Sequence, residues 1–104
     1  MIKPMNFVQL AALCGVLGGS ATAALAYTGQ ELAPGAKVSL EEARTIALRT
    51  VPGQITAEEL EKERGGSGLR YSFDIKAKDA IHEVGIDAKT GAVLESSIEG
   101  AHSD

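Results

Sequence analysis

The most regular alternation of apolar and polar side chains lies between residues 69 and 77. A period of two predicts a β-strand with one buried face and one solvated face. The apolar positions of this strand are Leu69, Tyr71, Phe73, Ile75 and Ala77. The same period continues through residues 80–88, with His82 on the apolar face, and residues 92–98 form the last expected strand. These segments predict an antiparallel meander.

Residues 39–50 follow a different period and predict an amphipathic helix. Ser39 can cap its first turn, and Glu42, three residues later, completes the spacing of a capping box. The apolar stripe of the helix consists of Leu40, Ala43, Ile46, Ala47 and Thr50. Pro52 and Gly53 end the helix, because the residue before a proline is pushed out of the α region.

Residues 56–63 are ambiguous between helix and strand. Glutamate, leucine and lysine favour a helix, and Thr56 and Glu59 have a second capping-box spacing. A strand would instead place Glu58, Leu60 and Lys62 on one face and Glu59, Glu61 and Glu63 on the other. Local propensity alone therefore favours a helix here.

Glycine-rich and aspartate-rich turns separate the strands. Residues 65–68 form one turn and Lys78-Asp79 another, while Gly91 can supply a positive φ at the end of the turn that begins at Asp87. The helix has one apolar stripe and the sheet one apolar face, so each must cover the other. We therefore expect an α+β domain, with one amphipathic helix packed on a small antiparallel sheet of three to four strands.

Residues 1–26 have the layout of a secretory signal peptide. Lys3 is their one charged side chain, and about eleven mostly apolar residues follow from Phe7. Small residues come next, and two A-x-A sites fit: cleavage after Ala26, which we prefer, or after Ala23. The apolar run is shorter than the roughly 20 residues that a membrane span needs. We therefore expect a periplasmic or secreted bacterial protein with no stable membrane anchor after cleavage.

Charge and cysteine content narrow the possible partners. The chain has 10 basic and 14 acidic residues and a net charge of −4, and loss of Lys3 would leave about −5. An acidic domain is poorly suited to binding nucleic acid or anionic lipid.

The single cysteine is expected to be absent from the mature domain. Cys14 follows Leu13 within the apolar run, which does not fit a lipid attachment site, and cleavage would remove it. The domain would then have no disulfide and no thiolate metal site.

The expected layout is a signal peptide at 1–26, an extended lead-in at 27–38, the domain at 39–98 and a flexible tail at 99–104. The lead-in contains Pro34-Gly35 and shows no clear period. Packing alone must stabilise so small a domain, which leaves little room for an internal catalytic cavity.

No catalytic motif is present in the sequence. A zinc peptidase needs H-E-x-x-H on a helix, whereas His82-Glu83 is followed by Val84, Gly85 and Ile86 on an expected strand. No serine lies in a G-x-S-x-G elbow, and the one cysteine is expected to be lost. We therefore expect a protein that is not an enzyme and has no catalytic, cofactor or metal site.

Two weaker candidates for binding each have a structural and a functional interpretation. His82 could respond to pH or contact a ligand, but we favour a histidine at the margin of the core. The acidic run Glu58, Glu59, Glu61 and Glu63 could recognise a basic partner or a hard cation such as calcium. We favour a solvated strand that protects a sheet edge with charge.

The order of these features resembles the PepSY domain family. The resemblance covers about residues 38–95 and consists of E-A-R-x-I-A-L in the helix, V-P-G, a charged E-L-E segment, Y-S-F-D-I and H-E-V-G-I-D-A-K-T-G-A-V-L. Its most specific parts are Pro52-Gly53, Tyr71 and the run from Asp87 through Thr90 and Gly91 to Val93. The resemblance implies that residues 56–63 form the first strand of the sheet, against their local propensity.

PepSY domains occur in propeptides of secreted metallopeptidases and in cell-envelope proteins. The resemblance implies a non-catalytic binding module that restrains or modulates an envelope peptidase, or binds another exported protein. The alternative is a structural or sensory periplasmic module that binds another ligand or itself, as a monomer or weak homodimer. The candidate interaction or family-motif residues are Pro52, Gly53, Glu59, Glu61, Tyr71, His82, Asp87, Thr90 and Gly91.

Overall fold

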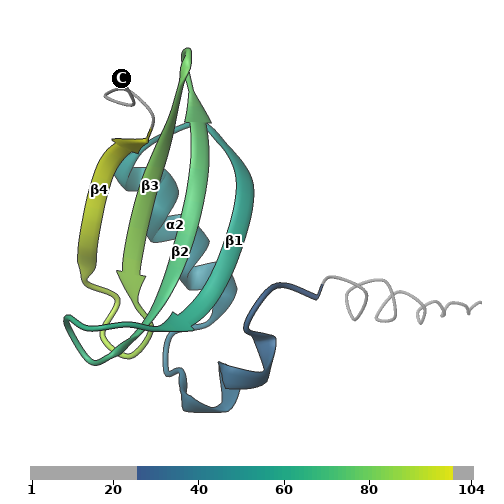
Figure 1. Cartoon of the computed structure of the whole chain (residues 1–104), viewed down its shortest axis with the longest axis vertical. Helices are drawn as coiled ribbons and strands as arrows, with labels where there is room; N and C mark the ends of the chain where they lie inside the picture. Colours follow the sequence, from purple (N-terminus) through teal and green to yellow (C-terminus); the bar gives the residue numbers. More distant parts are fainter. Residues whose placement is uncertain (1–25, 100–104) are drawn as a thin grey trace, which may run out of the picture.

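The computed structural model describes residues 26–99, in which one α-helix packs on one face of a four-stranded antiparallel sheet (Figure 1). The elements in chain order are η3 (Gln30–Gly35), α2 (Leu40–Thr50), β1 (Gln54–Lys62), β2 (Leu69–Ala77), β3 (Ala80–Asp87) and β4 (Val93–Glu99). This confirms the expected α+β fold. The predicted signal peptide at 1–26 and all but the first residue of the predicted tail lie essentially outside the described residues. Within residues 26–99, no helix is long and apolar enough to cross a membrane.

The strands lie in the order β1-β2-β3-β4, so each pairs with its neighbour in the sequence. Tyr71 of β2 stands opposite Leu60 of β1 and Ile86 of β3, which brings three buried side chains together on the helix side of the sheet. Pairing with β2 and the burial of Leu60 outweigh the helix propensity of residues 56–63. The strand implied by the PepSY resemblance is therefore confirmed.

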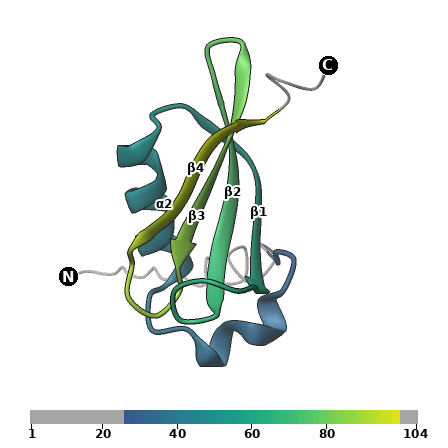
Figure 2. The same ribbon diagram turned by 60° about the vertical axis from the view of Figure 1, so that its left-hand side comes forward.

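Helix α2 lies against the sheet through its two smallest apolar residues. Ala43 and Ala47 are fully buried, which lets the helix backbone approach the strands closely (Figure 2). The capping box is present: the Ser39 hydroxyl accepts from the Glu42 amide at 3.0 Å, and the Glu42 carboxylate accepts from the Ser39 amide at 2.9 Å. Thr50 departs from the predicted stripe, because its side chain is exposed and donates to the Ile46 carbonyl at 2.9 Å.

The lead-in predicted as extended contains a 3-10 helix, η3, and this is a correction. Gly29 turns the chain with φ 85°, and its carbonyl accepts from the Leu32 amide at 2.8 Å. Just before it, Thr28 forms a parallel bridge with β1, and its carbonyl accepts from the Leu60 amide at 2.9 Å. The segment is thus held against the edge of the sheet at residue 60, a contact that its own sequence does not indicate.

Tyr71 joins the core of the sheet to the segment before the helix. Its ring is 2% exposed and stacks near Phe73, with ring centroids 6.3 Å apart. Its hydroxyl donates to the Val38 carbonyl at 2.7 Å. Burial is the main cause of the raised pKa of Tyr71, which keeps the hydroxyl protonated as a donor.

The Tyr71→Phe variant is expected to lose about 1–2 kcal/mol of unfolding free energy, because the partly buried Val38 carbonyl loses its donor. Urea denaturation followed by circular dichroism measures the change. Tyr27→Phe is the matched control, since the Tyr27 hydroxyl makes no hydrogen bond within residues 26–99, and it should change stability by less than about 0.5 kcal/mol. Equal effects of the two variants would contradict the role assigned to the Tyr71 hydroxyl.

Candidate functional site

The residues selected from the sequence lie in four separate parts of the fold. Glu59 and Glu61 are on the open face of the sheet, opposite Ser72 and Arg70. Tyr71 and His82 are on the helix side, and the remaining residues lie in two connections. Those are Pro52 and Gly53 between α2 and β1, and Thr90 and Gly91 between β3 and β4, with Asp87 at the end of β3 where that connection begins. The structure therefore does not bring the nine residues together into one site.

Asp87 ties the β1–β2 connection to the β3–β4 turn. Its carboxylate is 1% exposed and accepts four hydrogen bonds. The donors are the Ser67 amide at 2.6 Å, the Ser67 hydroxyl at 2.7 Å, the Lys89 amide at 2.8 Å and the Thr90 amide at 3.1 Å. Burial alone would raise the pKa of Asp87, but these donors outweigh it and lower the pKa to about 2. Asp87 is therefore a structural residue of the family motif.

Gly53 and Gly91 serve close packing and turn geometry. A Cβ on Gly53 would lie 2.5 Å from the Lys76 carbonyl oxygen and 2.9 Å from Cγ2 of Ile75, so the chain passes directly over the end of β2. Gly91 has φ 83°, the positive value predicted for the end of the Asp87 turn. Close packing at Gly53 and the positive φ at Gly91 thus account for the two glycines of the motif.

The open face of the sheet is acidic. Carboxylates and one hydroxyl line a hollow of about 190 Å³ that includes Glu59, Glu61, Ser72, Asp74, Glu83 and Glu99. Partial burial raises the pKa of Glu83, and the charges of neighbouring carboxylates add to that effect. Within residues 26–99, no group of three or more histidine, cysteine, aspartate or glutamate side chains is arranged to hold a metal ion. Glu59 and Glu61 of the acidic run thus belong to this acidic face.

Arg70 is a buried cation at one end of this face, and the sequence pattern did not indicate it. Its side chain donates to Glu95 on β4 at 3.2 Å and to the Arg64 carbonyl at 3.2 Å. A Cβ on Gly85 of β3 would lie 2.9 Å from the Arg70 guanidinium, so this glycine lets the arginine cross β3 to reach β4. Arg70 thus links β2 to β4 across β3.

A second ion pair fixes the helix to β1. Arg44 makes two hydrogen bonds to Glu58, at 2.8 Å and 2.6 Å, a bidentate geometry. Glu58 lies on the helix side of β1 while Glu59 and Glu61 lie on the other side, as a strand requires. One member of the acidic run therefore has a structural partner.

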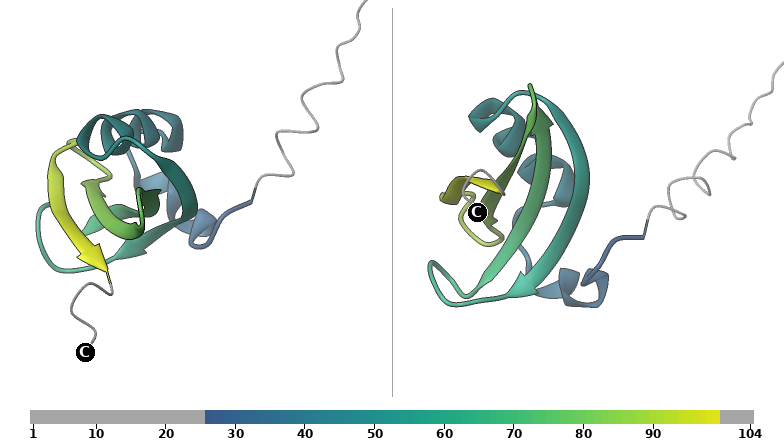
Figure 3. Two further views of the ribbon diagram at one scale, coloured as in Figure 1. Left: turned by 90° about the horizontal axis from the view of Figure 1, so that it is seen from above. Right: turned by 45° about the horizontal axis from the view of Figure 1, so that its top comes forward.

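Strand β4 forms an edge of the sheet and carries two exposed apolar side chains. Val93 and Ile98 are 46% and 44% exposed. They pair across to Ile86 and to His82, which places them on the helix side of the sheet. His82 is half-buried between Ile75 and Ile98, at the margin of the core that we favoured for it. Figure 3 shows β1 and β4 as the two edges of the curved sheet.

Comparison with known proteins identifies one family. The family model described as "PepSY: Peptidase propeptide and YPEB domain" matches residues 37–96, and no catalytic family was found. Neither the curated proteins nor the solved structures gave a match. The matched range begins before the helix cap and ends within β4, so it contains the helix, strands β1 to β3, the first part of β4 and both motif connections. More than half of the sequence is covered, and the chain belongs to the PepSY family.

Proposed function

We propose that this protein is an exported, non-catalytic binding module that restrains or modulates a cell-envelope peptidase. Membership of the PepSY family supports a binding role, and the layout of residues 1–26 supports export. The docking element that we propose is β4, by strand addition at the edge of the sheet. The single observation that carries this choice is the pair of exposed apolar side chains, Val93 and Ile98, on an edge strand.

The two sheet edges differ in ways that favour β4. Strand β1 is partly covered by the bridge between Thr28 and Glu59, and acidic residues dominate its second half. Strand β4 spans seven residues, contains neither proline nor lysine, and has one neighbouring strand within residues 26–99. An added strand would complete backbone hydrogen bonds along β4, and its alternate side chains would cover the apolar pair.

Inhibition of peptidase activity tests this proposal. The purified protein is added in excess to the envelope fraction of its own cells, and hydrolysis of a fluorogenic casein substrate is followed. We expect saturable inhibition by the native protein and its loss in a Val93→Lys/Ile98→Lys variant, because lysine on an edge strand opposes strand addition. Thr45→Lys, on the exposed outer side of α2, is the control and should inhibit like the native protein. Undiminished hydrolysis with the native protein would reject the peptidase role.

The same edge supports a second candidate, self-association. Two copies of β4 can pair antiparallel about a two-fold axis, which would make a symmetric eight-stranded sheet and cover both apolar pairs. Sedimentation velocity over a hundredfold concentration range separates the candidates. A dimer that the Val93→Lys/Ile98→Lys variant abolishes, without any peptidase inhibition, would favour the structural or sensory role.

A further inference from the structure

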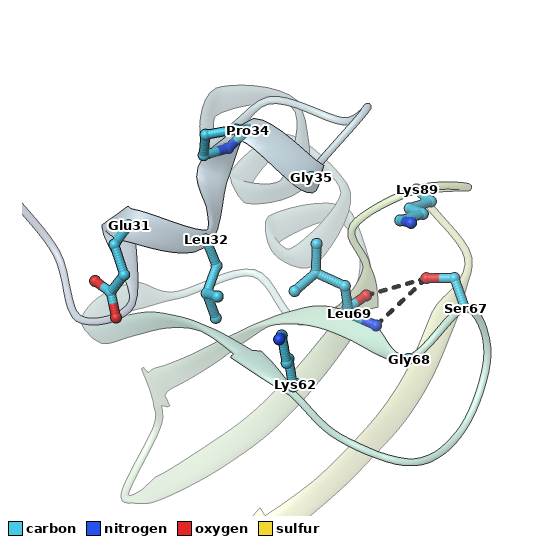
Figure 4. Close-up of a pocket in the computed structure, with 9 residues that line it drawn as sticks. All are labelled: Glu31, Leu32, Pro34, Gly35, Lys62, Ser67, Gly68, Leu69 and Lys89. Carbon is cyan, nitrogen blue, oxygen red and sulfur yellow. Dashed lines mark hydrogen bonds between the residues drawn. The ribbon is translucent and has the colours of Figure 1, made fainter.

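A hollow separate from β4 and from the acidic face lies between η3 and the start of β2 (Figure 4). Its volume is about 440 Å³, within the range of roughly 300–1,000 Å³ that small-molecule sites occupy. Leu32 of η3 and Leu69 of β2 point into it from opposite sides, and Pro34 completes the apolar part of its lining. Three apolar side chains from two elements therefore face one open space.

Two lysines line the same hollow. Lys62 comes from the end of β1 and Lys89 from the β3–β4 turn, while Glu31 lies on the other side, away from Lys89. Neither lysine forms an ion pair within residues 26–99. The chain as a whole is acidic, and the hollow on the open sheet face is lined by carboxylates. Two lysines without an ion pair among the described residues thus lie beside an apolar surface, in a protein whose net charge is negative.

The Asp87 network holds this side of the hollow in place. Ser67 and Lys89 both line the hollow, and both donate backbone hydrogen bonds to the buried Asp87 carboxylate. The Ser67 hydroxyl is also engaged with Asp87, at 2.7 Å. The lysine ammonium groups are therefore the charged donors left for a ligand, and the backbone that carries Lys89 is already ordered. Such preorganisation lowers the entropic cost of binding.

We propose that this pocket binds the carboxyl-terminal end of a peptide whose last side chain is apolar. The terminal carboxylate would lie between Lys62 and Lys89, and the last side chain would pack between Leu32 and Leu69. An apolar surface of three side chains suits one leucine-sized group, whereas a long alkyl chain needs a longer enclosed cavity. This site is distinct from β4, so the proposal does not depend on the proposed peptidase role.

Titration with a short peptide tests the pocket. The probes are acetyl-Gly-Gly-Leu with a free carboxylate, the same peptide as its carboxyl-terminal amide, and hexanoate. The protein is purified in the form that its own cells accumulate, and its NMR chemical shifts report binding. We expect the free acid to bind with a Kd on the order of 0.1–1 mM at low salt and the amide to bind at least about tenfold more weakly. Shifts should be centred on Leu32, Leu69 and Lys89.

Charge-removing variants locate the site. Lys62→Gln and Lys89→Gln are each expected to weaken the peptide about threefold, and the double variant about tenfold. Lys76→Gln, an exposed lysine on β2 that does not line the hollow, is the control and should bind like the native protein. Equal binding of acid and amide, or equal effects of all three lysines, would overturn the proposal. Hexanoate binding as tight as that of the peptide would overturn the assignment to a peptide end.

Discussion

Replacing Asp87 by asparagine is expected to lower the free energy of unfolding by about 2–4 kcal/mol. The carboxylate accepts four hydrogen bonds from three residues, at 2.6–3.1 Å, and is 1% exposed. Asparagine retains one acceptor oxygen but turns an amide NH2 toward donors on the other side, so at least one buried N–H loses its partner. Urea denaturation followed by circular dichroism measures the loss.

Asp79→Asn is the matched control for this substitution. Asp79 occupies the β2–β3 turn, is exposed, and accepts no side-chain hydrogen bond within residues 26–99. The change of charge and shape is the same, so any difference between the two variants comes from the buried network. We expect Asp79→Asn to shift stability by less than about 0.5 kcal/mol. A similarly small effect of Asp87→Asn would show that the four hydrogen bonds contribute little.

The lowered pKa of Asp87 also predicts an acid-sensitive fold. The pKa is about 2 in the folded protein against an ordinary value of 3.8. Because the folded-state pKa is the lower one, the stabilisation is fully present above about pH 4 and is lost as the pH falls toward 2. A shift of this size corresponds to roughly 2.5 kcal/mol. Asp87→Asn should lack this contribution, so the stabilities of native protein and variant should converge between about pH 4 and pH 2.

Local patterns were sufficient for the helix and three of the strands. Ser39 and Glu42 interact within one helical turn, and alternation along residues 69–77 is a property of that strand alone. Strand β1 is different, because glutamate, leucine and lysine have no intrinsic preference for a strand. Its pairing with β2 decides the outcome, so only the resemblance to the PepSY family, which reflects the whole fold, predicted it.

The contacts that the sequence did not reveal join residues far apart in the chain. Arg44 pairs with Glu58 and Arg70 with Glu95, across 14 and 25 residues. No local period marks such pairs, and from sequence alone an arginine is expected to be a solvated surface residue. The pocket beneath η3 is a further case, since its lining comes from the lead-in and three separate connections or strand ends. Such sites follow from tertiary packing alone.

The candidate residues also show the difference between local features, which the sequence reveals, and long-range contacts, which it does not. Asp87 and Gly91 were recognised as turn residues, and the turn is where they lie, but the link from Asp87 to Ser67, 20 residues earlier, was not foreseen. Strand β4 is the last strand of the meander and lies at an edge of the sheet. The exposure of Val93 and Ile98 depends on how far α2 extends over the sheet, which requires the structure.

The Gly29→Ala variant is expected to lose about 2–4 kcal/mol of unfolding free energy and to release η3 from the sheet. Two costs combine here. Gly29 has φ 85°, a conformation that costs an L-residue roughly 1–2 kcal/mol. The added Cβ would also overlap the Leu60 carbonyl oxygen of β1, so the backbone must move away. The movement breaks the hydrogen bond from Leu60 to Thr28 and exposes Leu32.

Two other glycines separate these costs. Gly68 also has a positive φ, 94°, but an added Cβ meets nothing within 4 Å, so Gly68→Ala isolates the conformational cost at about 1 kcal/mol. Gly35 lies in η3 itself, and its added Cβ would make ordinary contact with Leu69 at 3.6 Å, so Gly35→Ala should be nearly neutral. Urea denaturation gives the three stabilities, and limited proteolysis within residues 30–36 reports release of η3. Only Gly29→Ala should accelerate that cleavage, because only there does the side chain force the segment off β1; equal cleavage of all three variants would mean that η3 is not held at Leu60.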